Sequence, residues 1–201
     1  MDIHPVILDG QSIRLVPMAL EHIDGLCAVG LEPSLWRWTP AAICTRADMR
    51  TYVETALKSE ADGLALPFTT MLRDNGTIVG STRYGAIDRA NRRVEIGWTW
   101  IGTRWQRTSV NTEAKYLMLR HAFENLGCYR VEFKTDVLND RSRTALLRIG
   151  AREEGILRQH MMTSTGRLRD TVYYSVIDAE WPGVKLELEK MMARTPAPKG
   201  V

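Results

Sequence analysis

Residues 94–123 predict a strand, a short turn and a long helix in immediate succession. In the first part, large apolar residues alternate with polar or small ones, the period of two expected of a half-buried strand. These large residues are Val94, Ile96, Trp98 and Trp100. Apolar residues then return at helical spacing and leave a narrower polar stripe. The helical apolar positions are Ala114, Leu117, Met118, Ala122 and Phe123, and the polar stripe is Glu113, Arg120 and Glu124. The rest of the chain is organised around this unit.

The turn at residues 103–111 is a candidate anion site. It carries Arg104 and Arg107 and leads directly into the helix. The first N–H groups of a helix have no partner within the helix, and together with the helix dipole they favour a negative charge. The alternative is an ordinary connection between a strand and a helix, with its arginines in solvent.

The other elements follow from the same two periods and from turn residues. Strands are predicted at residues 12–18, 64–73, 77–87, 129–137, 151–163 and 169–178, and helices at residues 20–29, 46–59, 140–149 and 180–192. Thr45 and Asn139 are the expected helix N-caps, and Gly150 is a C-terminal stop. Asn75 and Gly76 favour a tight hairpin. The segment at residues 35–40 is either a packed loop or a wall of the substrate site.

The order of these elements indicates an α+β fold in one domain. Three consecutive antiparallel strands precede the central helix, and the strand at residues 129–137 follows it by a parallel crossover. A chain of 201 residues suits a single domain, which we place at residues 1–192. The Pro-rich end, residues 193–201, is expected to be a flexible tail.

Composition excludes several classes of protein. A net charge of +3, from 27 basic and 24 acidic residues, is too balanced for a protein that wraps nucleic acid. The three cysteines, Cys27, Cys44 and Cys128, show neither disulfide nor zinc spacing. There is no secretory leader pattern and no apolar run of membrane-spanning length, so we expect a soluble, cytoplasmic protein that needs no membrane partner and no metal. Hydrolase, P-loop and dinucleotide motifs are absent.

Several motifs resemble the GNAT acyltransferase superfamily, and in particular its RimJ/RimL-like N-acetyltransferase branch. Residues 106–111 (QRTSVN) occupy the position of the acyl-CoA motif Q/R-x-x-G-x-G/A, and residues 112–114 (TEA) follow as in that branch. Ser109 and Asn111 depart from the two small positions of the motif. Residues 139–142 (NDRS), 150–155 (GAREEG), 169–176 (RDTVYYSV) and 180–181 (EW) match further signatures in the right order.

The resemblance implies a fold and a cofactor. GNAT proteins have a twisted, mostly antiparallel sheet with a splayed parallel pair in its middle and helices on both faces. They bind acetyl-CoA in that gap, with the pantetheine arm beside one strand and the pyrophosphate at the turn. Carried over to this chain, the cofactor-binding residues are Trp100 and Ile101 for pantetheine, Asn139 near the sulfur, and Gln106, Arg107, Thr108, Ser109, Val110, Asn111 and Thr112 for the pyrophosphate.

The resemblance also suggests catalytic residues. Glu95 lies on the strand where many GNAT members carry their general base, and its alternative role is a solvated carboxylate paired with Arg92 or Arg93. Many members have a tyrosine seven residues after the asparagine as the general acid, but here that position is Leu146. Ser142 is therefore the candidate partner of the departing thiolate, although a serine in the first turn of a helix often acts only as a cap.

Two functions remain open at this stage. The first is an acetyl-CoA-dependent N-acetyltransferase that acts on a primary amine, either a peptide N-terminus or a small molecule, by direct attack in a ternary complex. The alternative is a catalytically weak acyl-CoA-binding or regulatory module, suggested by Ser109, Asn111 and Leu146. The sequence identifies no acceptor and leaves a homodimer open.

Overall fold

The computed structural model describes residues 1–194. In this part of the chain, eight strands form one sheet in the order β1-β2-β3-β4-β5-β6-β8-β7. The strands are β1 Leu8–Asp9, β2 Ile13–Pro17, β3 Leu66–Leu72, β4 Ile78–Asp88, β5 Arg93–Ile101, β6 Arg130–Asp136, β7 Arg152–Met162 and β8 Leu168–Ile177. The α-helices are α1 Ile23–Gly30, α2 Arg46–Ala61, α3 Val110–Arg120, α4 Asp140–Arg148 and α5 Trp181–Arg194.

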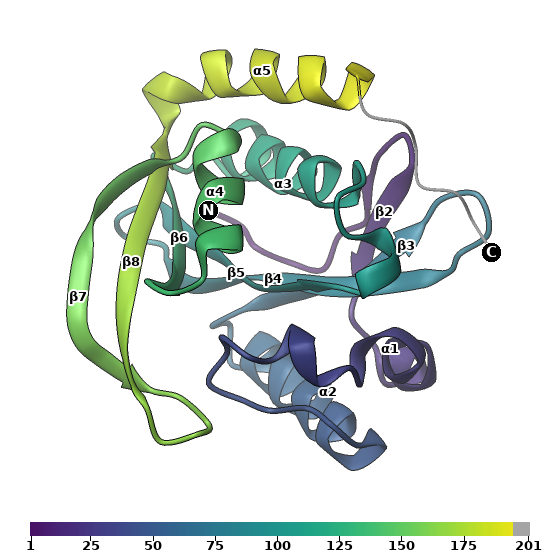
Figure 1. Ribbon diagram of the computed structural model, residues 1–201. Helices are drawn as coiled ribbons and strands as arrows, with labels where there is room; N and C mark the ends of the chain where they lie inside the picture. Colours follow the sequence, from purple (N-terminus) through teal and green to yellow (C-terminus); the bar gives the residue numbers. More distant parts are fainter. Residues whose placement is uncertain (195–201) are drawn as a thin grey trace.

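Helices cover both faces of the sheet (Figure 1). α1 and α2 lie against one face, while α3, α4 and α5 lie on the opposite side. Neighbouring strands in the described chain are antiparallel except β5 and β6, which are parallel and joined through α3. The predicted α+β class, the antiparallel meander and the parallel crossover are therefore confirmed.

Two apolar cores form on the two faces of the sheet. The larger one lies between the sheet and α3 and includes Phe68, Tyr84 and Leu117. The smaller one lies under α1 and α2 and includes Leu26, Met49 and Trp100. Their separation explains why the strands in the middle of the sheet are apolar on both faces, since each face is covered by helices.

A β-bulge in β5 corrects the predicted alternation of this strand. Between the pairs Arg83↔Gly97 and Ser81↔Trp100, β5 has one residue more than β4. Trp98 lies in this extra stretch with a φ of +50°. A single extra residue reverses the faces that follow it. Val94 and Ile96 therefore pack in the core beneath α3, whereas Trp100 packs in the core beneath α1 and α2.

The predicted helix ends agree with the structure. Thr45 caps α2 by a capping box, since its Oγ1 accepts from Asp48 N at 3.1 Å and its own N–H donates to Asp48 Oδ2 at 2.9 Å. Asn139 caps α4 by accepting from Ser142 N at 3.1 Å. Gly150 follows α4 with a φ of +88°, which a side chain would disfavour. Short polar residues therefore set these boundaries as their local chemistry predicts.

The two ends of the central helix differ from expectation. A turn of 3-10 helix, Thr103–Trp105, precedes α3, and a π-helical segment, His121–Asn125, continues it beyond Arg120.

The last helix, α5, extends to Arg194, two residues into the segment predicted as a flexible tail. The remainder of that tail, residues 195–201, lies outside the described residues. Among the described helices, none has both the length and the apolarity to cross a membrane.

Candidate active site

The parallel strands β5 and β6 separate soon after they meet. Only three register pairs join them, from Arg93↔Arg130 to Glu95↔Glu132. β5 then continues to Ile101 and β6 to Asp136 without pairing with each other. The facing edges of both strands therefore carry backbone groups that are available to an extended ligand. The gap that the resemblance implied is present.

The N-terminus of α3 faces the open end of β5 across a short turn. The Glu113 N–H donates to the Ser109 carbonyl at 2.8 Å and closes the first turn of the helix. The Val110 N–H instead contacts Thr108 Oγ1 at 3.3 Å. Asn111 and Thr112 come before Glu113, whose N–H makes the first hydrogen bond within the helix. The N–H groups of Asn111 and Thr112 are therefore available to a ligand. This geometry suits an anion such as a pyrophosphate.

Ser109 is buried at this helix start, and its hydroxyl lacks a partner within residues 1–194. The side chain is 3% exposed, and its Oγ atom has no hydrogen bond. A buried hydroxyl without a partner is costly, so this atom is poised to donate to a bound ligand. The residues present therefore fit a phosphate group, even though Ser109 replaces the expected glycine.

Other residues predicted for the cofactor shape the turn itself. The side-chain amide of Gln106 donates to the Ile101 carbonyl at 2.9 Å and ties the turn to the end of β5. Arg107 has a φ of +62°. Thr112 is buried and accepts from Arg148 Nη2 at 3.3 Å. Gln106 and Thr112 therefore use their side chains for contacts within the protein. The backbone N–H groups of the turn remain as donors for a ligand.

Glu95 is a buried carboxylate, and its partner was not predicted. The residue is 6% exposed, and its Oε2 forms an ion pair with Lys134 Nζ of β6 at 2.7 Å. Burial alone would lower the pKa of Lys134, but the hydrogen bond and charge of Glu95 raise it. The suggested pairing with Arg92 or Arg93 is wrong, because Arg93 contacts Asp88 and Glu132 instead.

Lys115 is a buried residue of this region that the sequence analysis missed. It extends from α3 across the gap, where its Nζ donates to Thr99 Oγ1 of β5 at 2.7 Å and lies 5.7 Å from the ring centre of Phe133 of β6. Burial lowers the pKa of Lys115 to about 7, although the charge of Glu95 raises it. Residues four apart share one face of a helix, so Lys115 lies on the same face as Asn111 at the start of α3. This spacing could have identified Lys115 as a residue of the gap.

An aromatic cluster lies beside Glu95 on the face covered by α1 and α2. Trp98, re-aimed by the bulge, is 49% exposed. Its ring and that of Tyr52 of α2 both contact the guanidinium of Arg83, with centroid distances of 4.9 and 5.0 Å. The Tyr52 hydroxyl lies 3.1 Å from Ser81 Oγ. Aromatic side chains, a cation and a carboxylate thus meet where β5 leaves β6.

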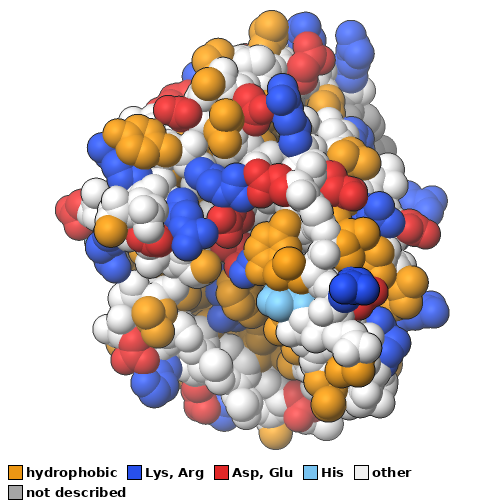
Figure 2. Space-filling model, turned by 90° about the vertical axis from the view of Figure 1, so that its left-hand side faces the viewer, with side chains coloured by type: hydrophobic (Ala, Val, Ile, Leu, Met, Phe, Trp, Pro, Cys, Tyr) orange, Lys and Arg blue, Asp and Glu red, His pale blue; other side chains and the backbone are white. Residues whose placement is uncertain are grey.

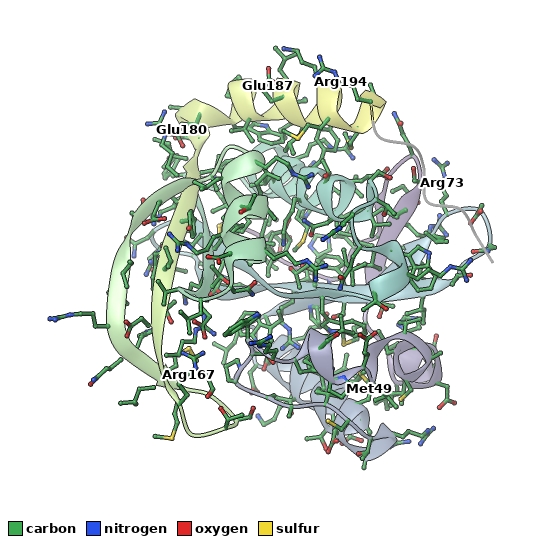
Figure 3. All side chains as sticks on the ribbon, in the orientation of Figure 1. Met49, Arg73, Arg167, Glu180, Glu187 and Arg194 are labelled. Carbon is green, nitrogen blue, oxygen red and sulfur yellow. The ribbon has the colours of Figure 1, made fainter. Side chains whose placement is uncertain are left out.

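The loop at residues 35–40 packs against the rest of the fold, in agreement with the first alternative given for it. Trp36 is buried and donates from its Nε1 to the Gly30 carbonyl at 2.7 Å. Trp38 is half-buried and lies 5.8 Å from the guanidinium of Arg167, which comes from the β7–β8 hairpin. Figure 3 shows Arg167 at this lower end of the hairpin. Figure 2, which views that side, shows a hollow with hydrophobic side chains deep between charged ones. A role of this loop as a wall of the substrate site stays a prediction.

Asn139 and Ser142 lie at the start of α4, just beyond the end of β6. The Asn139 side chain is engaged as the cap described above. Leu146 is buried in the larger core, so no hydroxyl replaces the missing tyrosine at that position. Ser142 is half-buried. Of the two predicted catalytic residues, Glu95 thus comes from the start of the gap and Ser142 from its far end.

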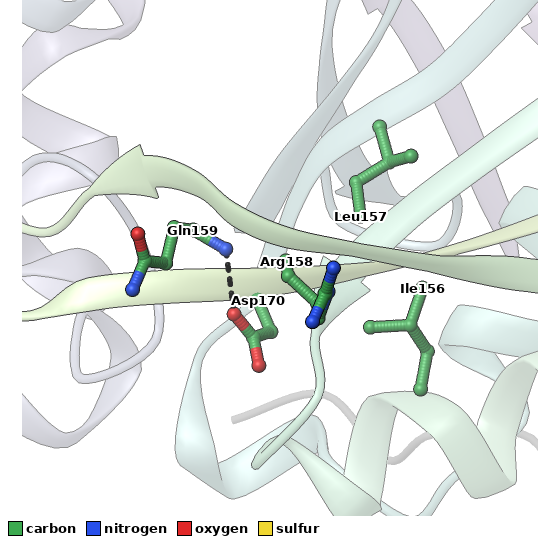
Figure 4. Close-up of a pocket in the computed structure, with 5 residues that line it drawn as sticks. All are labelled: Ile156, Leu157, Arg158, Gln159 and Asp170. Atoms are coloured by element: carbon green, nitrogen blue, oxygen red, sulfur yellow. Dashed lines mark hydrogen bonds between the residues drawn. The ribbon is translucent and has the colours of Figure 1, made fainter.

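A second hollow lies apart from these residues on the outer strands. It is lined by Asp170 and by a bulged part of β7 (Figure 4), namely Ile156, Leu157, Arg158 and Gln159. The Asp170 carboxylate accepts from the Gln159 N–H at 2.7 Å and supports the bulge. Every residue of β7 is exposed. This hollow is therefore a feature of the sheet edge and shares no residue with the gap.

Comparison with known proteins identifies the family. The sequence profile of the acetyltransferase (GNAT) domain matches residues 12–152. The chain belongs to the GNAT acetyltransferase family. A GCN5-related N-acetyltransferase from Brucella melitensis has a similar structure, with a TM-score of 0.88 and 34% identity over 96% of this chain and 87% of that one. The predicted superfamily, fold and enzyme class are confirmed.

Two further relatives bear on the predicted branch. "Putative ribosomal N-acetyltransferase YdaF" of Bacillus subtilis is 35% identical over 55% of this chain and 60% of its own length, so the match spans less than two thirds of that relative. RimJ of Mycobacterium smegmatis, solved in complex with CoA-disulfide, shares the fold with a TM-score of 0.79 and 22% identity, over 93% of this chain and 92% of that one. The first agrees with the RimJ/RimL-like resemblance, and the second shows the shared fold.

Proposed function

We propose that this protein transfers the acetyl group of acetyl-CoA to a primary amine by direct attack in a ternary complex, and that residues 1–192 form its catalytic domain. The observation that carries the proposal is the gap between β5 and β6, with Glu95 at its start and the N-terminus of α3 at its open end. The relative YdaF is named as a ribosomal N-acetyltransferase, which favours a peptide N-terminus as the acceptor. A small-molecule amine is the second candidate. We place the protein in the cytoplasm.

The proposed cofactor site uses backbone groups. The unpaired edge of β5 near Trp100 and Ile101 would receive the pantetheine arm, and the free N–H groups of Asn111 and Thr112 would receive the pyrophosphate. The unpartnered Ser109 hydroxyl adds a donor to this cradle. Arg107 contributes positive charge nearby, and Asn139 lies toward the sulfur. Bound acetyl-CoA would supply the acetyl group as an activated thioester.

The proposed chemistry assigns a proton transfer to Glu95 and a hydrogen bond to Ser142. Glu95 accepts the proton of the attacking amine, directly or through water, because it is the buried carboxylate at the start of the gap. Lys134 holds that carboxylate in place through the 2.7 Å ion pair. Ser142 donates a hydrogen bond to the departing thiolate from the first turn of α4, while solvent supplies the proton of the thiol and takes up the proton that Glu95 removed from the amine. The bound acceptor and cofactor react without a covalent intermediate on the chain.

The first test is stabilisation by cofactor. A ligand that binds only the native state raises the free energy of unfolding by about 2.7 kcal/mol at a hundredfold excess over Kd. We therefore expect millimolar CoA or acetyl-CoA to raise the melting temperature, with adenosine alone as the control. An unchanged melting temperature with both thioester and thiol would refute the cofactor assignment. Thiol release from acetyl-CoA with a panel of amines then separates the enzyme from a regulatory module that binds without turnover.

The second test uses Ser109, for which we expect opposite effects on stability and affinity. Ser109→Ala removes a buried hydroxyl without a partner, so the free protein should be unchanged or more stable by about 1 kcal/mol. The same change should weaken CoA binding about tenfold, because a hydrogen bond to a charged group is lost. Calorimetric titration with CoA and chemical unfolding measure the two quantities. Equal CoA affinity in both proteins would remove Ser109 from the proposed site.

A further inference from the structure

Arg83 is a buried cation without a negative partner among the described residues. It is 5% exposed, its Nε is fully buried, and it forms no hydrogen bond or ion pair through its side chain. Arg93 and Arg130 of the neighbouring strands, by contrast, both form ion pairs with Glu132. Burying an unpaired charge is expensive. The fold keeps this charge at β4 although no carboxylate of its own compensates it.

Arg83 lies near Glu95, the residue at which the proposed function places the reacting amine. In the β4–β5 ladder Arg83 pairs with Gly97, and Glu95 pairs with Gly85, two residues along. Paired residues share a face of the sheet, so Arg83 and Glu95 lie on one face as diagonal neighbours. Both of their partners are glycines. A side chain at Gly85 would collide with the Trp98 ring. Glycine at this position therefore makes room for the Trp98 ring, which lies against Arg83.

Two aromatic rings lie against the Arg83 guanidinium. Tyr52 and Trp98 contact it through their ring faces, at 5.0 and 4.9 Å from Cζ, an arrangement in which arginine commonly stacks. Its N–H edge then remains for a ligand. A guanidinium edge matches a carboxylate, which accepts two parallel hydrogen bonds in one plane.

Arg169 shows by contrast why Arg83 stands out. Arg169 is also buried, with an Nε that lacks a partner. Burial lowers the pKa of Arg169, but the nearby carboxylates of Asp136 and Glu95 raise it. The charge of Arg169 is thus partly compensated by the chain itself. Within the described chain, Arg83 forms no ion pair of its own, because its diagonal neighbour Glu95 is paired with Lys134, so a bound carboxylate would supply its missing partner.

We propose that the acceptor is a primary amine that carries a carboxylate close to its amino group, and that Arg83 binds this carboxylate while the amine lies at Glu95. The inference rests on the proposed function and narrows its acceptor to a free amino acid or a peptide with an acidic N-terminal residue. The shared chemistry is an ammonium and a carboxylate separated by a few bonds. Arg83 is then a specificity residue, and Tyr52 and Trp98 hold its orientation.

The experiment compares matched acceptors that differ only in charge. Free α-amino acids are compared with their α-amides, and dipeptides that begin with Glu are compared with those that begin with Gln. We expect kcat/KM to favour the carboxylate member of at least one pair by about 10- to 100-fold, as for a hydrogen bond to a charged group. The first pair identifies free amino acids and the second identifies acidic peptides. Equal kcat/KM within both pairs would overturn the proposal.

Variants of Arg83 test whether it causes that preference. Arg83→Met keeps an apolar chain between the rings, and we expect it to abolish the preference by lowering kcat/KM for the carboxylate member far more than for the uncharged member, while the CoA affinity stays within about twofold. Arg83→Glu should shift preference toward diamines. The matched control is Arg89→Met, because Arg89 is exposed and only contacts the Gly63 carbonyl. A preference that survives in Arg83→Met would assign the carboxylate to another residue and refute this one.

The two levels of the proposal can fail separately. If no amine releases thiol with the wild-type protein, the transferase function fails. Binding of N-acetyl amino acids and of their amides is then compared by calorimetric titration in the presence of CoA. Tighter binding of the acids by wild type, lost in Arg83→Met, supports the carboxylate site by itself. Equal binding of acids and amides refutes it.

Discussion

Replacing Glu95 with glutamine should lower kcat by about 10²- to 10⁴-fold, the usual contribution of a general base. The change keeps the size and hydrogen-bonding shape of the side chain and removes its charge. Because the proposed proton transfer occurs in the transition state, kcat should fall far more than the affinity for CoA. Steady-state kinetics with a cognate amine, together with a CoA titration, measures both effects.

Glu132 provides the matched control for this experiment. It lies opposite Glu95 in the β5–β6 ladder, is also buried, and forms ion pairs with Arg93 and Arg130. Glu132→Gln removes the same charge from the same face but outside the proposed role, so kcat should change by less than tenfold. If Glu95→Gln destabilises the fold by leaving Lys134 unpaired, the double change with Lys134→Gln removes both charges. Near wild-type kcat in either Glu95 variant would show that this carboxylate is not the base.

Local chemistry was enough to predict most of the fold. Periods of two and 3.6 placed the strands and helices, and Thr45 and Asn139 marked helix starts because their side chains bond to nearby N–H groups. The gap between β5 and β6 followed from the resemblance carried by residues 106–114. These features depend on residues within a few positions of each other, which a sequence displays directly.

The errors concern partners that are distant in sequence. Glu113 was placed on a polar stripe, but it is 3% exposed and accepts from the N–H groups of Gln11 and Ser12. Glu95 pairs with Lys134, 39 positions away, and no period indicates such a contact. The bulge at Trp98 adds one residue to β5 directly after Gly97, but a lone glycine in an alternating strand pattern does not show that an extra residue follows it. Tertiary contacts decide these cases, so a single sequence leaves them open.

The candidate site was predicted in its backbone more than in its side chains. The turn at residues 106–112 was expected to bind through its N–H groups, and Gln106 and Thr112 use their side chains for internal contacts in agreement with that role. Lys115 and Arg83 were not considered, because an isolated charge in a helix or strand is usually solvated. Only their burial, 5% exposed in each case, sets them apart.

Lys115→Met should stabilise the protein, which is an unusual result for a charged residue replaced in a candidate active site. Burial lowers the pKa of Lys115 from 10.5 to about 7, and at about 1.4 kcal/mol per pKa unit this corresponds to a penalty of about 5 kcal/mol at neutral pH. Loss of the hydrogen bond between Lys115 and Thr99 offsets about 1 kcal/mol of the stability gained by removing this penalty. We therefore expect the free energy of unfolding to rise by about 3 to 4 kcal/mol at pH 7.

The dependence on pH identifies the cause of this gain. Between pH 7 and 10.5 the unfolded chain binds a proton at Lys115 that the folded chain has lost, so wild-type stability rises with pH by about 1.4 kcal/mol per unit from this group. The difference between Lys115→Met and wild type should thus be largest at or below pH 7 and shrink toward pH 10. Urea unfolding at pH 6.5, 7.5 and 9.5 measures it, with Lys190→Met as the control because that lysine is exposed. A difference that is constant across this range would show that packing, and not the buried amine, accounts for the change.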